Sequence, residues 1–233
     1  MSTSGALPLH RHSAPHRELA RRYRRHLKKP EFALSVVLSF VSFLVSVFVV
    51  QPFVVDFATE RASNSVTDIV LSNTPVFDVD GFFVYGMFLL IVFITLLCLA
   101  HPKRIPFTLY SLTLFVLIRC VFVSLTHLAP FAVHVSSDFG PAVSRAFFGS
   151  DLFFSGHTGA PFLMALVYWR EKSLRYVFLL WSVFFAVIVL LGHFHYSIDV
   201  LSAFFITYGI FHIAEWLFPR SCMLFLSDDL AET

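Results

Sequence analysis

Charged residues are scarce in this sequence of 233 residues: Asp, Glu, Lys and Arg make up 14% of it, whereas a soluble domain carries roughly 25%. Glycine is scarce as well, with 9 residues against 30 phenylalanines, and 57% of the chain is hydrophobic. The mean hydropathy is +0.77. This composition excludes an ordinary soluble domain. It predicts one compact membrane domain that uses nearly all of the apolar residues.

Cysteine is also rare, because the chain has only three. Cys98 and Cys120 lie inside apolar runs and Cys222 follows the last one, so the sequence contains no disulfide framework. Neither an HExxH motif nor the paired-cysteine spacing of zinc sites is present. We therefore expect neither a metal nor another cofactor.

Six apolar runs approach the roughly 20 residues that a helix needs to cross the hydrocarbon core. The sequence thus predicts an all-α membrane protein, a bundle of six transmembrane helices within a catalytic domain over residues 32–218. No small-residue cleavage site follows the first run, so we expect it to be a retained anchor. The predicted spans are Phe32 to Gln51, Phe82 to Ala100, Pro106 to Thr126, Phe153 to Trp169, Leu174 to Gly192, and Ile198 to Phe218.

The distribution of Lys and Arg predicts the orientation in the membrane. Eight of the 17 lie in the N-terminal arm, residues 1–31, and 14 fall on the inner side if that arm is cytoplasmic. The outer connections then hold two, Arg61 and Arg145, which places both termini in the cytoplasm. A basic arm beside a span usually contacts anionic lipid heads, so we expect no nucleic-acid partner. We expect residues 219–233 to form a cytoplasmic tail that ends in a short disordered acidic segment, Ser227 to Thr233.

Ionisable residues within membrane spans are costly and are therefore candidates for function. Three places qualify: Arg119, the stretch from Ser155 to Gly159, and the stretch from His195 to Asp199. The predicted topology puts all three in the outer half of the membrane or at its outer end. The long outer connections, Pro52 to Gly81 and His127 to Leu152, are expected to cover such a site.

His195 and Asp199 are spaced i, i+4, so they share a face if the sixth helix begins at or just before His195. A carboxylate on one ring nitrogen fixes the tautomer and makes the other nitrogen a better nucleophile. His157 lies at the outer end of the fourth run, at the same level of the membrane. We therefore expect His157, His195 and Asp199 to be catalytic residues.

Ser155 and Gly156 precede an apolar run and are typical of a helix N-terminus, where free backbone N–H groups and the helix dipole favour a phosphate. We expect Ser155, Gly156 and Thr158 to bind a substrate phosphate there. Arg119 lies about 20 Å along its span from the cytoplasmic side. It is expected to neutralise phosphate charge, although pairing with a structural carboxylate is about equally plausible for an isolated arginine.

Other polar and aromatic residues have simpler interpretations. A single histidine near the end of a span is most often an interfacial residue with a satisfied ring, and tryptophan and tyrosine are most often interfacial anchors or packing residues. We expect Glu215, near the inner end, to extend to the interface or to form an ion pair. The histidines interpreted as interfacial are His127, His134, His193 and His212. The aromatic residues interpreted as anchors or packing residues are Tyr196, Trp169, Trp181 and Trp216.

Two stretches resemble the type 2 phosphatidic acid phosphatase superfamily, and more closely its sphingomyelin synthase branch: Gly149-Ser150-Asp151-Leu152-Phe153-Phe154-Ser155-Gly156-His157-Thr158 and His195-Tyr196-Ser197-Ile198-Asp199-Val200. Arg119-Cys120 and Thr126-His127-Leu128-Ala129-Pro130 are similar to a third-span motif of that branch. The Lys-x6-Arg-Pro signature of ordinary lipid phosphatases is absent. In the first motif, Ser150 separates Gly149 from Asp151, which affects the choice of substrate more than the chemistry.

The resemblance implies a mechanism and partners. His195 would attack phosphorus with the support of Asp199, and His157 would protonate the leaving alcohol. The partners would be a membrane phospholipid donor and a lipid alcohol acceptor, ceramide or diacylglycerol, with the active site at the extracytoplasmic or lumenal face. Two alternatives stay open: a lipid-phosphate phosphatase of the phosphatidic acid phosphatase type, and a membrane protein that binds lipid without catalysis.

Overall fold

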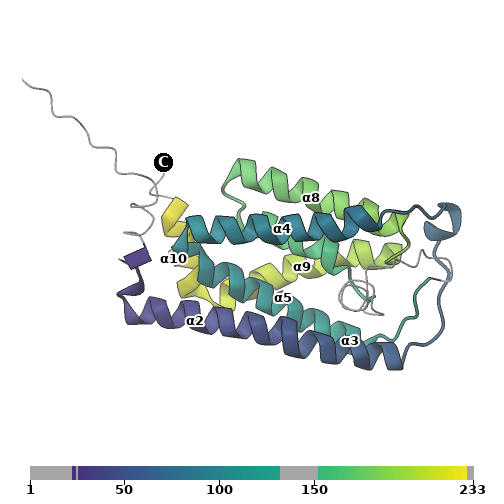
Figure 1. Ribbon diagram of the computed structural model, residues 1–233, viewed down its shortest axis with the longest axis horizontal. Coiled ribbons are helices and arrows are strands. Elements are labelled where there is room, and N and C mark those ends of the chain that lie inside the picture. The colour runs from purple at the N-terminus through teal and green to yellow at the C-terminus, as the bar shows by residue number, and fades with distance from the viewer. Residues whose placement is uncertain (1–22, 25, 132–151, 230–233) are drawn as a thin grey trace, which may run out of the picture.

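The computed structural model describes residues 23–24, 26–131 and 152–229, and over these ranges it is helical without any strand. The all-α prediction is therefore confirmed. Most helices lie side by side along one long axis (Figure 1). In chain order they include α2 (Pro30–Val45), α3 (Gln51–Glu60), α4 (Asp80–Ala100), α5 (Ile105–Leu125), α7 (Gly156–Val167), α8 (Lys172–Leu191), α9 (Ser197–Leu217) and α10 (Pro219–Asp229).

Five helical segments of the described chain are long and apolar enough to span a membrane. The protein is therefore an integral membrane protein with several spans. The expected fourth span, Phe153 to Trp169, is instead the short helix α7 of 12 residues. The five segments are Pro30–Glu60, Asp80–Ala100, Pro102–Leu125, Lys172–Leu191 and Ser197–Leu217.

The first span is longer than the sequence predicted. It does not end at Gln51 but continues through Pro52 to Glu60, because a π-helical turn, Ser46–Val50, joins α2 to α3. A proline inside an α-helix lacks one N–H donor and clashes with the carbonyl four residues earlier. The wider π turn shifts the hydrogen bonds at this place, with the N–H of Gln51 donating to the carbonyl of Ser46. The connection between the first two spans therefore begins after Glu60, not at Pro52.

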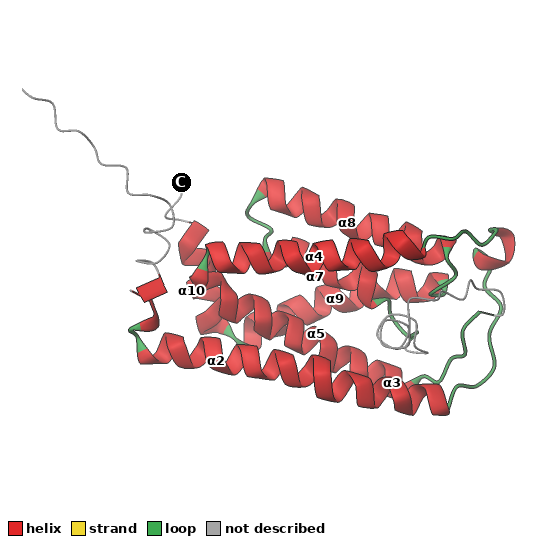
Figure 2. Ribbon diagram, in the orientation of Figure 1, coloured by secondary structure: helices red, strands yellow, loops and turns green. Residues whose placement is uncertain are grey.

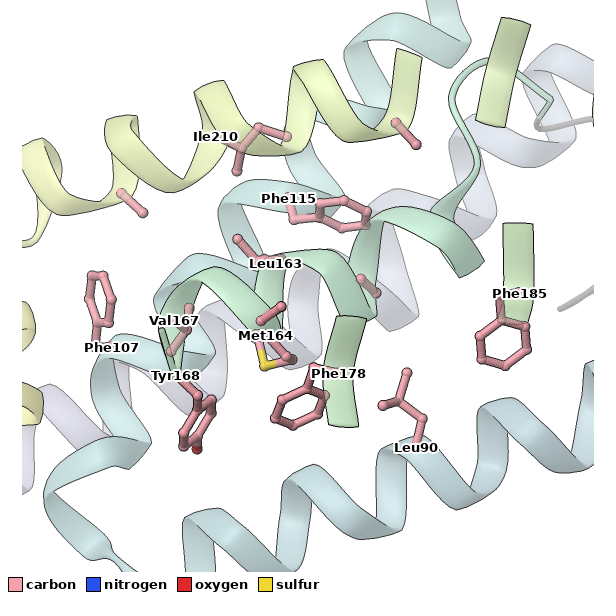
Figure 3. Close-up of a cluster of buried hydrophobic side chains, with 14 of the residues drawn as sticks. Leu90, Phe107, Phe115, Leu163, Met164, Val167, Tyr168, Phe178, Phe185 and Ile210 are labelled. Carbon is pink, nitrogen blue, oxygen red and sulfur yellow. The ribbon is translucent and has the colours of Figure 1, made fainter. Parts of the chain in front are cut away.

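Helix α7 is the centre of the bundle and packs against α5, α8 and α9. Figure 3 shows its side chains Leu163, Met164 and Val167 among Phe115 of α5 and Phe178 of α8. Nine of its 12 residues are buried. A helix that is apolar on all sides is expected in this position.

The helices that carry the candidate residues start or end at one end of the bundle. In chain order the long helices alternate in direction, so α5 and α8 end where α7 and α9 begin (Figures 1 and 2). The connections 61–79 and 126–131 lie at this same end (Figure 2). Arg119 near the end of α5, His157 in the first turn of α7 and His195 just before α9 are thereby brought to one level.

The C-terminal segment differs from the expected disordered tail, because α10 includes residues up to Asp229. Its Phe225 is 1% exposed and lies near the guanidinium of Arg104, which is 5.4 Å from the ring centroid. Arg104 is itself buried and forms an ion pair with Glu171. An apolar anchor of this kind orders a segment that composition alone suggested to be mobile. Residues 230–233 lie outside the described chain.

Close packing around α7 depends on Gly159. A Cβ placed there would lie 2.8 Å from both Cε2 of Phe115 and Oγ1 of Thr207. At Gly209 of α9, by contrast, a Cβ would meet nothing within 4 Å. The two glycines thus form a matched pair of helical positions, one crowded and one open.

We predict that Gly159→Ala destabilises the protein by about 1–3 kcal/mol, because it overpacks the contact of α7 with α5 and α9. Gly209→Ala should be neutral or stabilise by up to about 1 kcal/mol, through helix propensity. Thermal unfolding of both purified variants in detergent micelles measures the difference. Equal midpoints for the two variants would contradict the packing of α7 described here.

Candidate functional site

The site is built around the turn that precedes α7. Phe154 is buried with φ at 30°, in the left-handed region where few residues other than glycine are found. Ser155 follows as the N-cap of α7, and its Oγ accepts a hydrogen bond from the N–H of Thr158 at 3.3 Å. Such a conformation is strained and needs support from its surroundings. Backbone groups of Leu152, Phe154 and Ser155 in this turn contact His195, Arg119 and Asp199.

Arg119 of α5 is one of those neighbours. Its Nε donates a hydrogen bond to the carbonyl of Phe154 at 3.1 Å, and its side chain is buried. A Cβ at Gly156 would lie 3.1 Å from the same Nε, so the missing side chain of Gly156 makes room for the guanidinium. Arg119 therefore lies beside the start of α7, and its contact with a substrate phosphate stays a prediction. The arginine places positive charge beside a helix N-terminus, and both features favour an anion.

His195 contacts the same turn from the opposite side. Its Nδ1 lies 2.9 Å from the carbonyl oxygen of Leu152. Because a carbonyl can only accept, the proton of the neutral ring belongs on Nδ1, and the lone pair is then on Nε2. The carbonyl of Leu152 therefore fixes the tautomer of His195, a role that the sequence predicts for Asp199.

Asp199 lies in the first turn of α9, and its Oδ2 is 3.5 Å from Nδ1 of His195. The shorter contact of this oxygen is with the N–H of Tyr196, at 3.0 Å, which caps the start of α9. The other oxygen, Oδ1, is buried and has no hydrogen-bond partner within the described chain. The expected condition for a shared helix face, a helix that begins at or just before His195, is not met, because α9 begins at Ser197; the two side chains nevertheless lie close together. The hydrogen bond to Nδ1 of His195 therefore comes from Leu152, and the Asp199 carboxyl lies nearby at a longer distance.

His157, in the first turn of α7, is half-buried among aromatic rings. Its ring centroid is 4.0 Å from that of Phe83 and 5.9 Å from that of Phe185. The residue before it, Gly156, lies beside Arg119, and the turn that leads into α7 contacts His195 through the carbonyl of Leu152. The two histidines of the prediction thus lie in one small region with apolar walls, which limits access by water.

Ser155 and Thr158 were expected to bind phosphate, and in this structure their hydroxyls face each other. Thr158 Oγ1 and Ser155 Oγ are 3.2 Å apart, and both side chains are fully buried. The described geometry gives them a role in capping α7. A phosphate contact by these two hydroxyls stays a prediction, as it does for Gly156.

The remaining histidines mostly fit their simpler interpretation. His193 is buried with φ at 56°, and its Nε2 lies 3.2 Å from the carbonyl oxygen of Thr74. His212 pairs with Glu215 at 2.8 Å, as expected for Glu215 if it forms an ion pair. The ring of His127 packs on Phe57. His134 and the motif residues Gly149, Ser150 and Asp151 lie outside the described chain.

Sequence reasoning missed Asp68, which lies in the connection between α3 and α4. Its Oδ2 accepts hydrogen bonds from the N–H and the Oγ of Ser197, at 2.7 and 2.8 Å. Burial alone would raise the pKa of Asp68, but the hydrogen bonds from Ser197 and from two nearby backbone N–H groups outweigh burial and lower the pKa below its usual range. Asp68 is therefore ionised at neutral pH. No signal in the sequence identified it, because its partner is 129 residues away.

The aromatic residues divide between the two simple roles expected of them. Tyr196 is buried at 1% exposure, and its hydroxyl donates to the carbonyl of Ala129 at 2.8 Å. It is therefore a packing residue. Trp169 and Trp216 are exposed at the other end of the bundle, as interfacial anchors are.

With this geometry in view, the comparisons with known proteins give one match. Residues 149–216 match the family model described as PAP2 superfamily C-terminal. This part of the chain holds both catalytic candidates His157 and His195 together with Asp199. The match supports the PAP2 superfamily, a group of phosphatases and phosphotransferases. No curated protein and no solved structure matches the chain.

Proposed function

We propose that this chain is a membrane-embedded phosphotransferase of the sphingomyelin synthase type, which moves a phospho-headgroup between lipids through a phosphohistidine on His195. One observation carries the proposal: the turn Leu152–Gly156 contacts Arg119, His195 and the backbone of Asp199 at once. The turn then continues directly into His157. A phosphate at the start of α7 would lie among an arginine, a helix N-terminus and two histidines.

Each residue has a definite role in this mechanism. The Nε2 lone pair of His195 attacks phosphorus and forms a P–N bond, while the P–O bond to the leaving lipid alcohol breaks and that oxygen takes a proton from a protonated His157. The Nδ1–H of His195 keeps its bond to Leu152, and the nearby Asp199 stabilises the positive charge that the ring acquires. In the second step, His157 removes the proton of the acceptor alcohol, the new P–O bond forms and the P–N bond breaks. Arg119 offsets the phosphate charge throughout.

The nature of the acceptor separates transfer from hydrolysis. The ring of His157 packs on Phe83 and Phe185, so an alcohol delivered from the bilayer reaches a site with apolar walls more readily than bulk water does. The motif around Arg119-Cys120 and the absence of the phosphatase signature also favour transfer, by resemblance. We therefore place a lipid alcohol, ceramide or diacylglycerol, as the acceptor, and a membrane phospholipid as the donor.

The phosphohistidine is the first test. Purified protein incubated with phospholipid carrying a labelled phosphate should retain acid-labile, base-stable label. His195→Ala should lose the label and, like His157→Ala and Asp199→Ala, lose activity by about a hundredfold or more, because these groups act as a unit. His212→Ala is the matched control, since this exposed histidine at the far end of α9 contacts Glu215 and the rings of Tyr208 and Phe211, all on its own helix. Full labelling of His195→Ala would contradict the assignment.

The acceptor is the second test. Membranes that contain the protein, given a fluorescent ceramide or diacylglycerol and a phospholipid donor, should form a new fluorescent phospholipid that thin-layer chromatography resolves. Membranes with His195→Ala should form none. Release of free phosphate from phosphatidate or a polyprenyl phosphate, with no lipid product from either acceptor, would show the phosphatase instead. If neither transfer nor hydrolysis is detected, the remaining alternative is a membrane protein that binds lipid without catalysis.

The face of the membrane is the third test. The excess of Lys and Arg at the opposite end of the bundle favours a non-cytoplasmic site and cytoplasmic termini. With the three native cysteines replaced by alanine, Ser72→Cys, in the exposed turn Leu71–Asn73, should react with an impermeant maleimide on intact cells or sealed vesicles of native orientation. Ser173→Cys, exposed in the first turn of α8, should react only after lysis. The reverse pattern would invert the proposed topology.

A further inference from the structure

The side chain of Asp68 links the connection 61–79 to α9, the helix that carries Asp199. Its Oδ2 accepts from the N–H and the Oγ of Ser197, and its Oδ1 accepts from the N–H groups of Val70 and Leu71, at 2.8 and 3.1 Å. The side chain is 7% exposed. Both carboxylate oxygens are therefore fully engaged. Oδ1 holds the local turn at Val70 and Leu71, and Oδ2 holds Ser197, the first residue of α9.

The place that Asp68 holds is close to the reacting groups. Ser197 is two residues after His195 and two before Asp199, and it is the first residue of α9. The N–H of Tyr196 is bound by Asp199 and the N–H of Ser197 is bound by Asp68. Two carboxylates from distant parts of the chain thus occupy two successive N–H groups at the positive end of the α9 dipole. Asp199 can therefore keep its position beside His195 only while the start of α9 is fixed.

A second residue keeps the same connection in place independently of Asp68. The Tyr196 hydroxyl accepts a hydrogen bond from the N–H of Val66 at 3.2 Å and donates one to the carbonyl of Ala129. Ser63 also binds the carbonyl of His127, through its N–H and its Oγ. Loss of the Asp68 carboxylate would therefore leave the connection attached while releasing the first turn of α9. This separation makes the role of Asp68 open to experiment.

We propose that Asp68 is a positioning residue for the phosphotransfer reaction: by binding Ser197 it holds the start of α9 in the orientation that keeps the His195 ring on Leu152 and beside Asp199. This role rests on the proposed function. Asp68 touches neither the phosphate nor the two histidines. Its effect reaches the reaction through the backbone of residues 195–199.

The kinetic test compares variants that change this contact by different amounts. Asp68→Asn replaces one of the two accepting carboxylate oxygens with an NH2 group, which cannot accept a hydrogen bond. Ser197→Ala removes only the hydroxyl donor. Each should lower kcat, Asp68→Asn by roughly ten- to hundredfold and Ser197→Ala by less, with KM nearly unchanged. Ser197→Thr keeps the hydroxyl and should restore most of kcat. Glu60→Gln, an exposed carboxylate at the end of α3, is the control and should behave as the unmodified protein.

A spectroscopic measurement tests position without relying on catalysis. In protein labelled with ¹⁵N-histidine in detergent micelles, the ring resonances of His195, assigned from their loss in His195→Gln, should show the proton on Nδ1. In Asp68→Asn these resonances should shift toward a mixture of tautomers, while those of His212 stay in place. If the unmodified protein transfers no headgroup at all, the proposed function fails, and this measurement alone decides the role of Asp68.

Two results would overturn the proposal. One is an unchanged kcat in Asp68→Asn together with unchanged His195 resonances. The other is that Asp68→Asn and Ser197→Ala lose activity only in proportion to the amount of folded protein recovered. In that case kcat of the folded fraction is normal, and Ser197→Thr restores nothing. The second result would make Asp68 a residue that stabilises the outer connection and nothing more.

Discussion

The structure depends on how one irregular turn satisfies its backbone inside an apolar bundle. An unpaired backbone carbonyl or N–H group buried away from water costs free energy comparable to a lost hydrogen bond, so the turn before α7 must find partners. Its carbonyls at Leu152 and Phe154 contact His195 and Arg119, and the N–H of Ser155 donates to the carbonyl of Asp199. The residues that would perform the chemistry are thus the same ones that make the turn possible.

This arrangement explains why α7 is short. Irregular backbone at membrane depth is tolerated only where protein covers it or where it lines a polar site. The bundle provides such a place by surrounding α7 with α5, α8 and α9, and by letting longer helices form the outer wall. The start of α7 thus lies inside the bundle, among α5 and α9, where its polar groups have protein partners.

A second layer of contacts holds the site from outside. Asp68 and Tyr196 connect the segment after α3 and the segment after α5 to the first turn of α9. These links are polar and lie at the end of the bundle, where water competes less than on an open surface. They attach the described parts of both connections, 61–79 and 126–131, to the start of α9. The apolar helices supply most of the stability, while these few hydrogen bonds determine the geometry.

The sequence by itself determined the helical class, most of the spans and the residues that meet, because hydrophobic blocks and the i, i+4 pair of His195 and Asp199 are local patterns. It also indicated that Arg119 lies in the half of its span where α7 begins, since depth along a span follows from helical rise, while the contact itself came from the packing of α5. Tertiary structure alone decided the continuation through Pro52, the helix α10, the bond from His195 to Leu152 and the contact of Asp68 with Ser197. Each of these depends on a partner far along the chain or on a change of helix type. No local pattern of residues encodes such a contact, because it exists only once the helices have packed.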